Sequence, residues 1–147
     1  MASVNTKATH KFVIVLNEKS PVGKLFSATG QLAMSLYDDA TPEQREQMSF
    51  IPFLNTGGSS LISITTCSFV VLKGTGNQLL TLYSTACQQD QFLSAIFTST
   101  MSYNSIEEDL LIKTATTPLD QMEPYGVGLF GSIEQLAPLT KKFSLFK

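Results

Sequence analysis

Apolar and polar positions change periodicity along this chain, and the changes predict a series of strands and helices. Residues 12–16 form an unbroken β-branched and aromatic run, which is typical of a strand covered on both faces. The next segment repeats one face at helical spacing, with Val22, Leu25, Thr29, Leu32, Ala33 and Leu36. We predict that this helix has Ser20 as its N-cap and Pro21 as its first residue.

The rest of the pattern extends the series. Further strands are expected at 50–54, 61–65, 66–73, 92–98 and 125–130, further helices at 42–48, 77–89, 104–116 (opening with Ser105) and 132–142, and an extended end at 143–146. Strands that alternate with helices favour the α/β class. We therefore predict a three-layer α/β/α sandwich with a mixed, mostly parallel four-stranded sheet. One domain is expected over 1–147, with a flexible tail at 1–9.

Composition adds a packed core and an unusually uncharged surface to this picture. Apolar residues make up 43% of the chain and charged residues 15%. So few charges favour a surface with apolar or hydroxyl-rich areas, as in a homodimer or a lined pocket. The net charge is −2 and Arg45 is the only arginine, which disfavours nonspecific binding to nucleic acid.

Cysteine usage and the first residues point to a cytosolic protein. Cys67 and Cys87 lie 20 residues apart with no histidine nearby, so they lack the ligand count of a zinc site. We expect two reduced, mostly buried thiols and no cofactor. The first ten residues contain no apolar signal segment, and no run reaches the roughly 18 apolar residues of a membrane span. These features predict a soluble, cytoplasmic protein.

The best candidate for a binding site is the start of the first predicted helix. Lys24 follows Val22 and Gly23 there, and the free amides of a first helical turn attract anions. Ser20 and Ser27 lie on nearby turns and could add hydroxyl groups. The alternative is that Ser20 only caps the helix and Lys24 is only solvated.

Candidates for catalysis are weaker, and the catalytic residues stay unknown. His10 is the only histidine, and it precedes the first strand, where we expect an exposed residue at a strand edge. Thr98 belongs to a hydroxyl-rich strand end that runs to Met101. Asp120 lies in a loop before a strand, a position available to a general acid or base. Lys24, Thr98 and Asp120 are the residues that a reaction could use.

The order of these motifs resembles a known fold. The chain resembles the peptidyl-tRNA hydrolase type 2 fold, and more closely it looks like the DUF2000 family, whose members share that fold. The residues that carry the resemblance are the strand at 12–17, Pro21-Val22-Gly23, Phe97-Thr98 to Met101, the glycine-rich strand at 125–131 and the end at 139–145. Together these segments span nearly the whole chain.

The resemblance also implies a catalytic pattern that this chain keeps only in part. In the hydrolase, a helix of the form GKxxAQxxHA carries a lysine and a histidine, and an Asp-Ala-Gly segment follows later. Gly23 and Lys24 match that helix, Gln31 stands in place of the histidine, and no Asp-Ala-Gly occurs. We therefore expect a module that binds a small molecule or a protein and has lost hydrolase chemistry. The alternatives are a hydrolase with a rearranged active site and a structural homodimer module.

Overall fold

A mixed sheet of five strands, in the order β5–β6–β1–β4–β7, forms the centre of the protein. The computed structural model describes residues 8–101 and 106–147. The strands are β1 (His10–Asn17), β4 (Ser68–Gly74), β5 (Leu93–Thr98), β6 (Pro124–Ser132) and β7 (Ser144–Leu145). The prediction of four strands is wrong, because the extended end of the chain pairs with β4 as a fifth. This pairing covers a sheet edge that would otherwise leave its backbone groups unpaired.

Strand directions differ from the mostly parallel arrangement that we predicted. β1 runs parallel to β4, whereas β6 is antiparallel to both β1 and β5, and β7 is antiparallel to β4. The physical reason lies in the connection between β5 and β6. It contains the 3₁₀ turns η1 (Ser99–Met101) and η2 (Leu119–Gln121) and the helix α4 (Glu107–Thr116). Thr98, the last residue of β5, pairs with Pro124, the first residue of β6. The chain therefore re-enters the sheet at the end where it left, and β6 runs antiparallel to β5.

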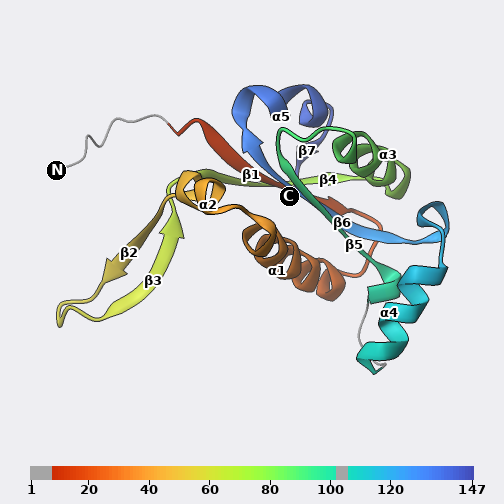
Figure 1. Cartoon of the computed structure of the whole chain (residues 1–147), viewed down its shortest axis with the longest axis horizontal. Coiled ribbons are helices and arrows are strands. Elements are labelled where there is room, and N and C mark those ends of the chain that lie inside the picture. The colour runs from red at the N-terminus through yellow and green to blue at the C-terminus, as the bar shows by residue number, and fades with distance from the viewer. Residues whose placement is uncertain (1–7, 102–105) are drawn as a thin grey trace.

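Helices pack against both faces of the sheet (Figure 1). The side chains of Phe12, Ile14 and Leu16 form one apolar cluster with α1 (Val22–Asp39). Val13 and Val15 belong to a second cluster with α3 (Gly76–Cys87) and α5 (Ile133–Thr140). Successive side chains of a strand point to opposite faces. The predicted double-sided burial of the first strand is therefore confirmed.

Glycines in β6 let α1 lie close to the sheet. A Cβ atom added at Gly126 would lie 2.9 Å from Leu32 Cδ1 and 3.0 Å from Leu16 Cδ2. One added at Gly128 would lie 3.2 Å from Leu32 Cβ. The absence of a Cβ at these two positions therefore allows α1 to approach β6 closely.

A short helix and a hairpin lie between α1 and β4. α2 (Pro42–Met48) opens with a capping box between Thr41 and Gln44, at the position that we predicted. β2 (Phe50–Leu54) and β3 (Ser60–Thr65) pair only with each other and extend away from the sheet (Figure 1). Both strands were predicted.

Several local predictions need correction. Cys67 is buried, but Cys87 is exposed because it ends α3 on the solvent side, and both thiols are free. His10 is half-buried and not an exposed edge residue, since its ring stacks on Phe130 at 5.6 Å. The predicted Ser105 start of α4, and most of the predicted tail, fall outside the described residues.

Candidate functional site

Three parallel-running strands bring their carboxyl ends to one edge of the sheet. β1 ends at Asn17, β4 at Gly74 and β5 at Thr98. The Asn17 side chain is buried at this edge, where its amide donates to the Pro124 carbonyl at 2.9 Å and its oxygen accepts from the Lys19 amide at 3.1 Å. In open α/β sheets such an edge is where ligands bind. The loop that leaves it leads directly into α1.

Helix α1 begins one residue later than the sequence predicts. Pro21 has φ −59° and ψ 139°, which is an extended conformation, and it acts as the N-cap before Val22. The prediction of Ser20 as the cap is therefore wrong, and no side chain caps this helix within the described residues. Ser20 is buried, and its hydroxyl has no hydrogen-bond partner among those residues. The helix start thus has an uncapped first turn next to a buried hydroxyl group.

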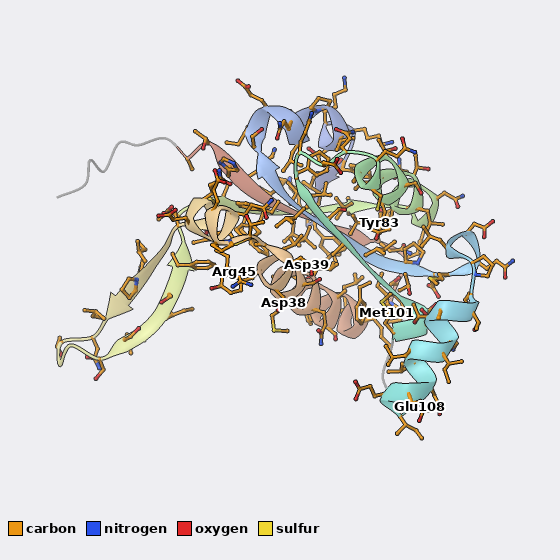
Figure 2. All side chains as sticks on the ribbon, viewed as in Figure 1. Asp38, Asp39, Arg45, Tyr83, Met101 and Glu108 are labelled. Carbon is orange, nitrogen blue, oxygen red and sulfur yellow. The ribbon has the colours of Figure 1, made fainter. Side chains whose placement is uncertain are left out.

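A polar stripe runs along one side of α1, and its second half lies beside β5. Lys24, Ser27, Gln31 and Ser35 follow one another at intervals of three or four residues and so share one side of the helix. Gln31 and Ser35 line a cavity of about 350 Å³ between α1 and β5. The other lining residues are Leu32, Ala95, Ile96, Phe97 and Met101. Figure 2 places Met101 at the end of β5, beside α4.

Only part of the predicted site lines a cavity. Val22 is 58% exposed and lines a second, apolar cavity of about 380 Å³ on another side of α1, so it does not belong to the buried face. Lys24 and Ser27 are half-buried and lie two turns and one turn before Gln31, respectively. The sequence interpretation missed Ser35 as a site residue. The signal that could have found it is the spacing of polar residues in an otherwise apolar helix.

Threonine hydroxyls connect β5 to α4. The Oγ1 atoms of Thr98 and Thr100 are 2.9 Å apart, and Thr114 donates to Thr100 Oγ1 at 2.9 Å. Thr98 is fully buried, so its hydroxyl serves this internal network. Asp120 lies on η2 and is exposed. The structure therefore does not bring Thr98 and Asp120 into the cavity that Gln31 and Ser35 line.

Among the described residues, neither a shifted pKa nor a group of metal ligands marks a further catalytic candidate beside the cavity. The pKa of Tyr83 on α3 is raised from 10.0 to about 12, first by burial of the phenol and then by its hydrogen bond with the Cys87 thiol. This tyrosine belongs to the cluster on the other face of the sheet. Residues 8–101 and 106–147 contain no group of three or more side chains suited to holding a metal ion. No helix in the same ranges is long and apolar enough to span a membrane.

Fold and cavity together define an α/β protein with a mixed sheet and a groove between its first helix and an edge strand. The chain belongs to the DUF2000 family, described as proteins of unknown function, whose model matches residues 10–147.

A solved structure has a fold similar to that of this chain. The structure is that of the protein of unknown function Atu0240 from Agrobacterium tumefaciens strain C58. It is 14% identical, with a TM-score of 0.78, over 95% of this chain and 98% of that one. At this identity the similarity shows the fold alone. No curated protein matches the chain.

Proposed function

We propose that this protein is a binding module that holds a small organic anion in the groove between α1 and β5. The observation that carries the proposal is the cavity of about 350 Å³, in which Gln31 and Ser35 stand beside the apolar side chains of Ala95 and Phe97. Ligand sites in proteins are commonly of this size, with mostly apolar walls and a few polar groups that fix orientation.

The start of α1 supports an anionic group on the ligand. The uncapped first turn carries a partial positive charge, and Lys24 adds a full charge on the polar stripe. The buried Ser20 hydroxyl lies in the loop just before this turn. Lys24 and Gln31 are seven residues apart, which is about 10 Å along a helix axis. A ligand that reaches both is therefore elongated, with an anion at one end and an apolar body at the other.

Nuclear magnetic resonance titration of the full chain with hexyl phosphate tests this proposal. We expect the amide signals of Val22, Gly23, Gln31 and Ser35 to shift, whereas inorganic phosphate should shift only the first two. Lys24→Gln removes one charge-assisted hydrogen bond, worth about 1.5–3 kcal/mol, and should weaken binding at least roughly tenfold.

A control variant and two contrary outcomes complete the test of the site. Lys141→Gln, on the exposed residue that ends α5, is the matched control and should bind hexyl phosphate like the wild type. Equal affinity of the Lys24→Gln variant would remove Lys24 from the proposal. Signal shifts confined to other parts of the chain would move the site away from α1.

The second candidate is a peptidyl-tRNA hydrolase with a rearranged active site that uses Lys24 with Thr98 or Asp120. Thr98 is buried in the threonine network and Asp120 lies on the exposed η2 turn, which favours the binding module. Incubation of the purified protein with peptidyl-tRNA separates the two functions. We expect no cleavage above that in buffer.

The proposal extends to the layers of the fold. We propose a three-layer α/β/α arrangement of the peptidyl-tRNA hydrolase type 2 kind, supported by the separate apolar clusters on the two sheet faces. The cytoplasmic location and the single domain over 1–147 stay predictions from the sequence.

A further inference from the structure

The hairpin formed by β2 and β3 exposes large apolar side chains on both of its faces. Its seven large apolar side chains are 42% to 69% exposed, namely Phe50, Ile51, Phe53, Leu54, Leu61, Ile62 and Ile64. If each buries roughly 200 Å² when covered, their exposed parts amount to roughly 700 Å². Each face of the hairpin exposes roughly half of this area, which lies within the about 300–600 Å² of the largest apolar patch on a typical monomer, a patch that is often functional. The hairpin therefore has the properties of an interface.

One face of the hairpin is entirely apolar. Ile51 pairs with Ile64 and Phe53 with Ile62, and residues directly opposite each other share a face. We call these four residues the arm face. Phe50 lies on the other face, and its ring meets Tyr37 of α1 edge-on at 5.9 Å. The arm face is thus the side of the hairpin turned away from this contact with its own chain.

The lack of charged residues in the hairpin indicates which kind of partner covers the arm face. No charged residue occurs between Glu46 and Lys73, although exposed strands normally carry charges that block pairing. The tip of the hairpin is polar, because Asn55 Oδ1 accepts from the amides of Gly57 and Ser59 at 2.9 and 3.0 Å. A hairpin that enters a lipid bilayer would need an apolar tip. An uncharged protein surface is the better match.

Such a surface runs along α1 of the same protein. Val22, Phe26, Gly30, Ala33 and Tyr37 recur every three or four residues, and we call them the α1 stripe. Phe26 is 75% exposed, and the stripe borders the apolar cavity of about 380 Å³. A helix of 18 residues is about 27 Å long, and a strand of six residues is about 20 Å long. The hairpin can therefore lie along the helix.

We propose that the protein is a twofold dimer in which each arm face packs along the α1 stripe of the other copy. Both surfaces belong to one chain and consist of uncharged side chains, with the Arg45 guanidinium over the Tyr37 ring at one end of the stripe. A twofold axis therefore joins them twice without any other partner. At roughly 200 Å² for each side chain, the arm face exposes roughly 380 Å² and Val22, Phe26 and Tyr37 of the α1 stripe expose roughly 350 Å². Together they approach the roughly 800 Å² per partner of a stable interface.

The base of the hairpin is fixed in a way that suits this role. The Arg45 guanidinium donates to the carbonyls of Tyr37 and Asp38, both at 3.0 Å, and thereby ties α2 to the end of α1 (Figure 2). Thr65 donates from its hydroxyl to the Met48 carbonyl. A fixed base holds the hairpin in one direction, which lowers the entropy lost when it docks.

Sedimentation of the full chain tests the dimer. We expect the wild type to be a dimer and the double variant Phe53→Lys/Ile62→Lys to be a monomer, because both lysines would lie in the apolar interface. The matched control, Thr56→Lys/Ser59→Lys, places the same charges at the polar tip and should stay dimeric. Circular dichroism should show the same fold for all three proteins. A monomeric wild type, or a dimer that the arm-face lysines leave intact, would overturn the proposal.

Cross-linking tests which surfaces meet. Two proteins, Phe26→Cys and Ile62→Cys, each in a Cys87→Ser background, are mixed and treated with a short bifunctional maleimide. We expect a linked dimer that contains one copy of each variant. If only Ile62→Cys links to itself, the hairpins pair with each other and the α1 stripe is not the receiving surface. Binding of a monomeric wild type to neutral phospholipid vesicles would assign the arm face to a membrane and overturn the proposal.

Discussion

At the scale of single residues, a shift of one position changes the roles of the side chains at the start of α1. Proline fixes its own φ near −65° and suits the first helical turn, so the sequence alone placed Pro21 inside the helix. Its ψ of 139° leaves it outside, and Ser20 then lies too early to cap. The serine is buried without a partner among the described residues. Backbone conformation, which local residue preferences do not fix, decided this detail of the candidate site.

Tyr83 gives a prediction for alkaline pH. Its pKa is about 12 in the folded protein, against 10.0 for an unperturbed tyrosine. Above pH 10 the unfolded chain loses this proton while the folded protein keeps it, so the free energy of unfolding should fall as pH rises from about 10 to about 12. An ultraviolet titration of tyrosinate should show one group with a pKa of about 12. Tyr83→Phe should remove both this group and its share of the stability loss.

At the scale of elements, local periodicity predicted most strands and helices to within a few residues. β2, β3 and α2 lie almost where the sequence places them, since turn residues and a capping box mark their ends. Strand direction and number were not predictable in the same way. The reversal of β6 depends on how a long excursion returns to the sheet, and β7 exists only because the edge of β4 is open.

Contact between α1 and β6 predicts opposite effects for two glycines. Gly126→Ala places a Cβ 2.9 Å from Leu32 Cδ1 and 3.3 Å from the Val15 carbonyl oxygen, and should lower the free energy of unfolding by about 1–3 kcal/mol. Gly30→Ala meets nothing within 4 Å inside its own chain, and in the arm-face variant Phe53→Lys/Ile62→Lys, where the α1 stripe stays uncovered, it should raise it by about 0.5–1 kcal/mol. Urea unfolding of both variants measures the difference. A loss at Gly30 as large as that at Gly126 would contradict this packing.

At the scale of the whole molecule, the hairpin and the sheet are separable parts. β2 and β3 pair only with each other, so the sheet does not depend on them for hydrogen bonds. The candidate groove lies between α1 and β5, whereas the arm face lies on the hairpin, so the proposed ligand site and the proposed hairpin contact occupy different surfaces of one chain.

Shortening the hairpin should separate folding from association. We expect a variant in which Asn-Gly replaces residues 51–64 to keep its sheet, because a two-residue turn can join Phe50 to Thr65, which already pair. Calorimetry should show a Tm that rises with protein concentration for the wild type and stays constant for the variant. Loss of folding in the variant would show instead that the sheet needs the hairpin.

Local sequence patterns alone predicted the α/β class, most element positions and the double-sided burial of β1. These follow from side-chain periodicity and residue size, which act over a few neighbouring positions. Four features became visible only in the folded chain: the fifth strand, the direction of β6, the burial of Thr98 and the cavity beside Gln31 and Ser35. Each of these depends on which distant segments meet. The same holds for the hairpin, whose apolar strands look like core strands until the fold leaves them exposed.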